Sequence, residues 1–150
     1  MRKLFTVALF VLCFGQYAYS QQSKEAAEIL NTEKKIANAV IKTDTLIVSS
    51  LLSPQYTCTL PDGKMITKQR FIKDIAEWWR PVSIEHAEQK VFLYKETAIV
   101  PGKATYRWKN KDGVIEEAVE QYTDTYISKT KNGCGLARMP RVYQEGVHNS

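Results

Sequence analysis

The chain has 150 residues, of which 44% are hydrophobic and 25% are charged, and its formal net charge is +5. This length suits one domain, which can bury about two-thirds of the surface that its unfolded chain exposes. The lysines are scattered over the whole sequence, so the basic balance does not indicate a DNA or RNA partner.

The N-terminus has the pattern of a cleavable signal peptide. Arg2 and Lys3 precede an apolar run from Leu4 to Gly15, and Ala18-Tyr19-Ser20 supplies small residues at the positions that a signal peptidase reads. We expect cleavage after Ser20 and a secreted or periplasmic protein. The apolar run is well short of the ~20 residues that a spanning helix needs, so we expect no stable membrane anchor. Removing residues 1–20 takes away two of the 21 basic residues and none of the 16 acidic ones, which lowers the net charge from +5 to +3.

Three helices and a small hairpin are predicted in the first half of the remaining chain. Apolar residues at helical spacing indicate an amphipathic helix from about Ser23 to Lys42. Asp44 is a candidate cap for a short second helix that ends before Pro54. Two β-prone runs on either side of Pro61-Asp62-Gly63 predict a hairpin. Thr67 can cap a third helix, whose shared face is expected to carry Phe71, Ile72, Ile75, Trp78 and Trp79 before Pro81 stops it.

The second half has strand-like periodicity. The predicted strands are Val82 to Tyr94, long or broken; Thr97 to Val100 together with Lys103 to Lys109; Val114 to Ser128; and Leu136 to Tyr143. Pro140 places the last one at an edge or a bulge. The predicted fold class is therefore α+β, a cone-shaped barrel of a strongly bent antiparallel sheet wrapped around three N-terminal helices. Residues 21–143 form this domain, and 144–150 form a tail.

Several positions together resemble the nuclear-transport-factor-2-like superfamily, and most closely its SnoaL-like, secreted branch of unassigned function. They are Asp44 with Leu46 to Leu52, Tyr56 with Pro61-Asp62-Gly63, Thr67-Lys68, and Gln121-Tyr122-Thr123-Asp124. The resemblance implies a cavity between helices and sheet, and a homodimer formed through the open face of the sheet. The ketosteroid isomerase relatives use a tyrosine and two acids, and the corresponding places here hold Ile36, Leu60 and Thr123. Their mechanism is not expected.

Aromatic residues are the main candidates for binding a small hydrophobic organic ligand. Rings on the elements around the expected cavity commonly line apolar pockets, although rings at core spacing also serve packing alone. The predicted ligand-binding residues are Tyr56, Trp78, Trp79, Tyr106, Trp108, Tyr122 and Thr123.

Asp124 and His86 are candidates for acid–base catalysis. Strand alternation puts Tyr122, Asp124 and Tyr126 on one face of their strand, but does not say whether that face points inward. If it does, Asp124 is a candidate general acid or base; if not, it is a surface charge. An imidazole such as that of His86 suits proton transfer near neutral pH.

No motif indicates a metal, a cofactor or a covalent nucleophile. The sequence has two histidines and no Cys-x-x-Cys or His-x-x-His spacing, so a zinc site is not expected. Cys58 and Cys134 remain after cleavage, and their spacing leaves both a disulfide and two free thiols open.

The sequence thus favours an exported binding or accessory domain over an enzyme. The first alternative is a cofactor-free lyase, isomerase or cyclase that uses Asp124 or His86. The second is a structural or protein-interaction dimer with a closed core.

Overall fold

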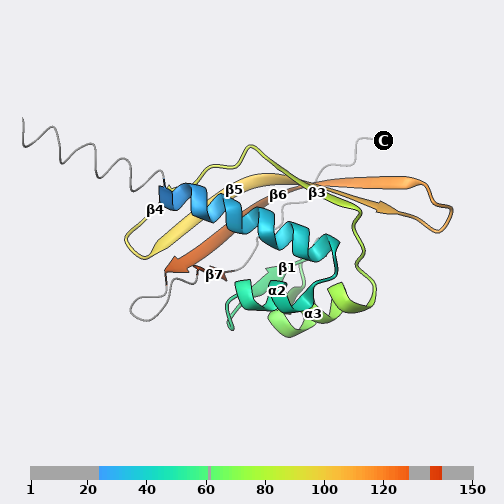
Figure 1. Cartoon of the computed structure of the whole chain (residues 1–150), viewed down its shortest axis with the longest axis horizontal. Coiled ribbons are helices and arrows are strands. Elements are labelled where there is room, and N and C mark those ends of the chain that lie inside the picture. The colour runs from blue at the N-terminus through green and yellow to red at the C-terminus, as the bar shows by residue number, and fades with distance from the viewer. Residues whose placement is uncertain (1–23, 61, 129–135, 140–150) are drawn as a thin grey trace, which may run out of the picture.

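The computed structural model describes residues 24–60, 62–128 and 136–139, and in it helices are followed by a curved antiparallel sheet (Figure 1). The first helix covers residues 24–41 of the described chain, and α2 follows at Thr45–Leu51. A hairpin of β1 (Thr57–Thr59) and β2 (Met65–Thr67) leads directly into α3 (Lys68–Glu77). The predicted fold class is confirmed.

The main sheet is built from β3 (Ser83–Ala87), β4 (Phe92–Leu93), β5 (Thr97–Lys109), β6 (Ile115–Ser128) and β7 (Leu136–Met139). Its order is β3-β5-β6-β7, with β4 also paired to β5, and every pairing is antiparallel. Within the described residues β3 and β7 do not pair with each other, so the sheet is open. The expected barrel is therefore a bent sheet that does not close.

Two predicted helix caps are present. The Asp44 carboxylate accepts a hydrogen bond of 3.0 Å from the backbone N–H of Ile47, and the Thr67 hydroxyl accepts one of 3.4 Å from that of Arg70. Each cap satisfies a backbone N–H that has no partner inside its helix. Lys68 acts at the other end of α2, where its ammonium group donates to the carbonyls of Ser49 and Leu52.

β5 runs without a break through Pro101, where the sequence predicted an interruption. The backbone N–H of Lys90 donates to the Pro101 carbonyl, so this edge of Pro101 faces the segment between β3 and β4. A residue's N and C=O point to the same side of a strand, and the missing N–H of proline therefore falls where the ladder is already interrupted. The sequence left open whether Val82 to Tyr94 is one long strand or a broken one; the segment is broken into β3 and β4, and the gap between them accommodates the proline.

The end of α3 differs from the expected one. The helix ends at Glu77, four residues before Pro81, and Trp78 takes a non-helical conformation with 62% of its surface exposed. Its indole N–H donates to the Asp74 carboxylate at 3.0 Å. Helical periodicity predicted that Trp78 shares the buried face of Phe71 and Ile75, and this prediction is wrong.

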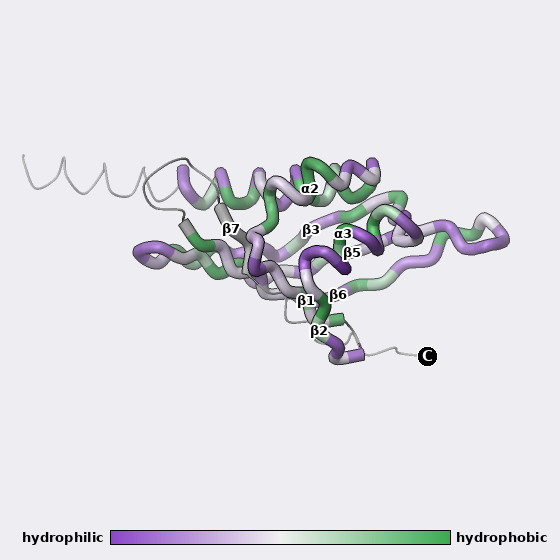
Figure 2. Tube along the Cα trace, turned by 90° about the horizontal axis from the view of Figure 1, so that it is seen from below, coloured by the Kyte–Doolittle hydropathy of each residue, from purple (hydrophilic) through white to green (hydrophobic). Residues whose placement is uncertain are grey.

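The first helix lies across one face of the sheet and supplies much of the core (Figure 1). Its buried residues are Ile29, Glu33, Ile36, Ala37, Ala39 and Val40. In Figure 2 hydrophobic stretches occur along the helices and in the middle of the sheet, whereas the far tip of the β5–β6 hairpin is largely hydrophilic. Burial of one helix stripe against one sheet face is the main source of stability in such a two-layer fold.

Three predictions fall on residues outside the described ranges. They are the signal peptide at 1–20, the edge or bulge at Pro140, and the tail at 144–150, and Cys134 also lies outside the described ranges. Cys58 is buried, but its pairing with Cys134 stays untested. Among the helices that the structure describes, none is long and apolar enough to cross a membrane.

Candidate functional site

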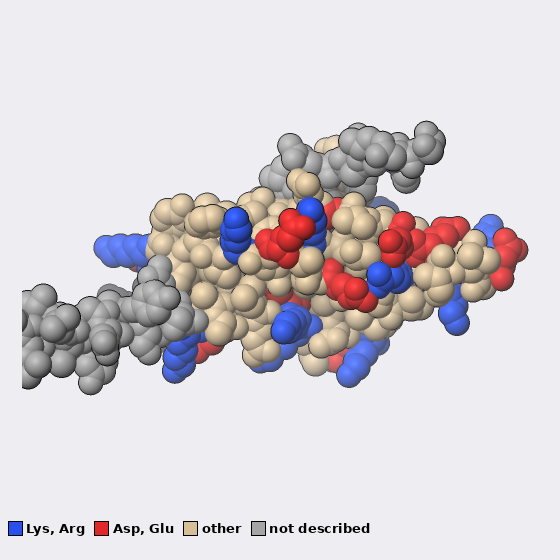
Figure 3. Space-filling view, turned by 90° about the horizontal axis from the view of Figure 1, so that it is seen from above, with Lys and Arg blue, Asp and Glu red and all other residues tan. Residues whose placement is uncertain are grey.

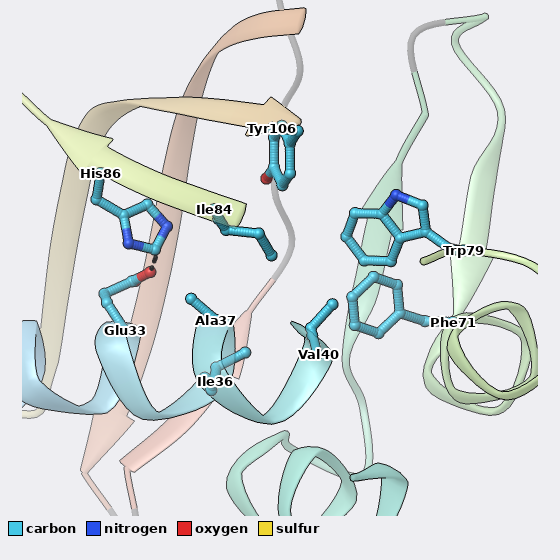
Figure 4. Close-up of a pocket in the computed structure, with 9 residues that line it drawn as sticks. All are labelled: Glu33, Ile36, Ala37, Val40, Phe71, Trp79, Ile84, His86 and Tyr106. Atoms are coloured by element: carbon cyan, nitrogen blue, oxygen red, sulfur yellow. Dashed lines mark ion pairs between the residues drawn. The ribbon is translucent and has the colours of Figure 1, made fainter. Parts of the chain in front are cut away.

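A small interior cavity lies between the first helix, α3 and the sheet (Figure 4). It has about 10 Å³ of room for the centre of a water-sized sphere, which is enough for about one water molecule. The residues that line it are Glu33, Ile36, Ala37, Val40, Phe71, Trp79, Ile84, His86 and Tyr106. In this conformation the domain is therefore closed around a mostly apolar cavity with two ionisable groups in its wall.

Glu33 and His86, the two ionisable groups in the cavity wall, form the polar half of the site. Glu33 projects from the first helix toward His86 on β3, with 3.8 Å between Glu33 Oε2 and His86 Nε2 (Figure 4). The other carboxylate oxygen of Glu33 accepts a hydrogen bond from the Tyr126 hydroxyl on β6. The side chain of Glu33 has no solvent exposure, and that of His86 has 7%. One buried carboxylate thus joins the helix to two strands.

The orientation of β6, which the sequence left open, is settled by burial. Tyr122, Asp124 and Tyr126 are buried, with 3%, 0% and 0% exposure, so this face of β6 looks toward the first helix. Tyr122 also stands edge-on to the ring of His86, with 5.6 Å between centroids. Its hydroxyl accepts a 2.8 Å hydrogen bond from the amide of Gln89. The inward orientation is the condition under which Asp124 becomes a candidate acid or base.

Gly102 makes room for Tyr122. The two residues are partners in the β5–β6 register. A Cβ on Gly102 would lie 2.9 Å from Cζ and from the hydroxyl of Tyr122, which is closer than such contacts are in proteins. The tyrosine ring can lie over β5 because residue 102 has no side chain.

Aromatic rings form the other half of the site. Trp79 packs between Phe71 and Tyr106, with ring centroids 5.7 and 5.8 Å away. Tyr56 is behind this row, 5.3 Å from Phe71, and is itself buried. Tilted rings at these distances attract one another, so the row is a rigid apolar wall.

The structure brings some of the predicted ligand-binding residues together and separates others. Trp79 and Tyr106 line the cavity, and Tyr122 contacts His86 beside it. Trp108 packs at the edge of the cluster of Ala104, Tyr106 and Tyr122, and its indole N–H donates to Glu116. Trp78 is on the surface, and Thr123 faces a groove on the other side of the sheet.

Glu33 was not among the predicted site residues. It lies four residues after Ile29 and three before Ile36, so it falls on the apolar stripe of the first helix. A carboxylate at such a position is seldom buried without a partner. That placement was the available signal, although only the tertiary structure identifies His86 and Tyr126 as the partners.

The opposite face of the sheet carries an open groove of about 930 Å³, between the segment that follows β3 and strands β5 and β6. Phe92, with 48% exposure, lies in its wall, and Lys103 forms an ion pair of 2.7 Å with Glu88. Further along this face, Arg107 on β5 donates hydrogen bonds to Glu85 on β3 and to Glu117 on β6. These two bonds raise the pKa of Arg107, and the bond to Glu85 has the larger effect. Figure 3 shows acidic and basic side chains intermixed on the surface seen from above.

Within the described ranges, no group of three or more His, Cys, Asp and Glu side chains lies close enough together to hold a metal ion.

This architecture is that of the NTF2-like proteins. The chain has the NTF2-like fold, with an α-helical layer on a curved antiparallel sheet. An NTF2-like protein from Salmonella enterica superposes with a TM-score of 0.70 at 13% identity, over 86% of this chain and 99% of that one. A second NTF2-like protein, from Cytophaga hutchinsonii, gives 0.68 at 14% identity, over 79% and 95% of the two chains.

The association domain of C. elegans CaMKII has the same fold, with a TM-score of 0.68 at 12% identity, over 83% of this chain and 98% of that one. No protein-family model matches the sequence, and no curated protein matches it significantly. At these identities the likeness shows the fold and leaves the chemistry to the site itself.

Proposed function

We propose that this protein is an exported small-molecule-binding or accessory domain whose ligand site is the interior between the first helix and the sheet. One observation carries the proposal: a buried polar group of Glu33, His86 and Tyr126 stands at one end of an aromatic wall. A few placed polar groups in an apolar surround are what ligand sites consist of.

A purely structural core would not need this arrangement. Removing an ionisable group from water costs free energy that its partners only partly restore, and apolar residues of similar size often stabilise as well or better. Ionisable groups that are buried together in this way concentrate at functional sites. Glu33 and Asp124 are both buried here, and a ligand explains their presence in the interior better than packing does.

The cavity must widen before it admits an organic molecule. Ligand sites usually measure ~300–1,000 Å³, far above the room for about one water molecule in the closed conformation. The first helix is the element to move, since it lies across the sheet as a separate layer (Figure 1). The ligand then binds an open form and shifts the population toward it.

Self-association through the outer face of the sheet is part of the proposal. Val119 and Phe92 expose 47% and 48% of their surface on or beside this face, next to the open groove. One neighbour in fold is by name an association domain, and others are named as hubs. A dimer formed there leaves the interior site accessible from the helical side.

Tryptophan emission and thermal unfolding measured against a library of small organic acids, sterols and polyketide-like compounds test this function. Trp79 lines the cavity, so a ligand should change its emission in a saturable way and raise the melting temperature together. If no compound in the library changes the tryptophan emission or the melting temperature, the proposal is rejected in favour of a closed core.

One observation favours a second function, a cofactor-free acid–base enzyme. Asp124 points inward with no exposure, close in sequence and on the same face as Tyr126 and Tyr122. A buried carboxylate beside phenol groups can move a proton and stabilise developing charge. An enzyme would lose turnover of a bound compound in the Asp124→Asn variant while still binding it, whereas a binding domain shows no turnover in either form.

A further inference from the structure

The carboxylate of Glu33 occupies a site that the sheet presents by itself. The two groups around it, the Tyr126 hydroxyl and the His86 ring, come from β6 and β3. The carboxylate comes from the other layer of the fold, the first helix (Figure 4). A hydroxyl donor and an imidazole on two strands are a receptor for one planar anion, and hydrogen bonds to ionised groups are among the stronger ones.

We propose that Tyr126 and His86 form a carboxylate-binding site that Glu33 fills as an internal ligand in the closed domain, and that the physiological ligand is a small organic monocarboxylate that takes its place. The proposal rests on the binding function proposed above and names its ligand class. Only room for about one water molecule remains beside Glu33, so an incoming anion replaces this side chain and does not bind next to it.

The exchange leaves the charge of the site unchanged. Asp124 is buried two residues before Tyr126 on the same face of β6, so it lies on the same side of the sheet as the site whichever of the two carboxylates occupies it. The released Glu33 side chain regains water as the helix moves, which offsets part of the energy of opening.

The rest of the cavity lining determines which chemical group the ligand carries at the end away from its carboxylate. From His86 the lining continues through Ile84 to Tyr106 and Trp79, which offer apolar and aromatic surface without a charge (Figure 4). A carboxylate joined to a compact apolar or aromatic body matches both ends of this wall. A dianion does not, because the far end has no cationic side chain in its lining.

The Glu33→Ala variant tests the site directly, since the atoms that it deletes, Cγ, Cδ and two oxygens, are those of acetate. We expect acetate to stabilise this variant against thermal unfolding in a saturable way. Acetamide, which has the same shape without the charge, and sodium chloride at equal ionic strength should not do so. Wild type should gain nothing from acetate, because the tethered Glu33 carboxylate outcompetes a free one.

Matched variants assign the effect to the receptor groups. Glu28→Ala removes an exposed carboxylate from the same helix and should not respond to acetate. In Glu33→Ala/Tyr126→Phe, loss of the hydroxyl donor should weaken acetate binding about tenfold or more. Equal stabilisation of Glu33→Ala by acetate and acetamide, or no stabilisation by either, would overturn the carboxylate site.

A second measurement applies if Glu33→Ala does not fold. Wild type with ¹³C-labelled histidine is titrated with phenylacetate and with phenylacetamide, and the His86 signals are followed. Displacement predicts a saturable shift with phenylacetate alone; no shift, or the same shift with both, contradicts it. If neutral compounds bind wild type but both carboxylate tests are negative, the proposed binding function stands and the carboxylate site is rejected. If acetate binds Glu33→Ala but no compound binds wild type, the carboxylate site stands and the proposed binding function is rejected.

Discussion

Glu33 and His86, 53 positions apart in the sequence, face each other across the helix–sheet boundary with 3.8 Å between carboxylate oxygen and imidazole nitrogen. Neither side chain has appreciable contact with solvent. The contact fixes the first helix over β3, and the hydrogen bond from Tyr126 fixes it over β6. The Glu33 side chain thereby links the helical layer to two strands of the sheet, and its contribution to the stability of the domain can be measured.

Tyr126→Phe should destabilise the domain by about 1–3 kcal/mol, because it removes a hydroxyl that donates to a buried carboxylate and leaves the ring in place. Denaturant unfolding measures the change. Tyr94→Phe is the matched control, since Tyr94 is 62% exposed and its variant should stay within about 0.5 kcal/mol of wild type. Equal effects of the two substitutions would show that the buried hydrogen bond contributes nothing.

Gly102→Ala should cost about 1–3 kcal/mol, because the new methyl group would lie 2.9 Å from Cζ and from the hydroxyl oxygen of Tyr122. The same unfolding experiment on a double-mutant cycle isolates the cause. Tyr122→Leu should cost less in the Gly102→Ala background than in wild type, since removing the ring relieves the contact. Additive energies would mean that the loss arises elsewhere.

Asp44→Ala should destabilise the domain by about 1 kcal/mol, because the backbone N–H of Ile47 loses its acceptor at the start of α2. Thermal or denaturant unfolding reports the loss. Asp44→Asn keeps a side-chain oxygen at the cap and should retain most of the stability. If the asparagine variant fell as far as the alanine variant, the cap would not be the source of the effect.

The two adjacent tryptophans should differ sharply in fluorescence. Trp78 is 62% exposed, whereas Trp79 packs between Phe71 and Tyr106. Trp108, the third tryptophan, is partly exposed, so the comparison is made in a Trp108→Phe background. In that background iodide should quench the parent protein and the Trp79→Phe variant strongly, and the Trp78→Phe variant much less. A ligand-induced change in emission, by contrast, should persist in Trp78→Phe and disappear in Trp79→Phe. Reversed behaviour would place the ligand outside the interior cavity.

Local features of the sequence were sufficient for most of the elements. The caps at Asp44 and Thr67 depend on a side chain and a backbone N–H three residues away, so the sequence contains the whole interaction. Alternation along β6 put Tyr122, Asp124 and Tyr126 on one face for the same reason. Periodicity failed at Trp78, where the helix had already ended and a hydrogen bond to Asp74 turned the indole outward.

The sequence by itself therefore determined the order of helices and strands, the starts of α2 and α3, and which residues share a face of a strand, because these follow from contacts between near neighbours. Only the tertiary structure decided which face of β6 is buried, that the sheet stays open, and that the cavity is closed to about the size of one water molecule. It also decided the partners of Glu33. Such contacts join residues 53 and 93 positions apart, and their geometry depends on how a helix packs on a twisted sheet, which no local pattern encodes.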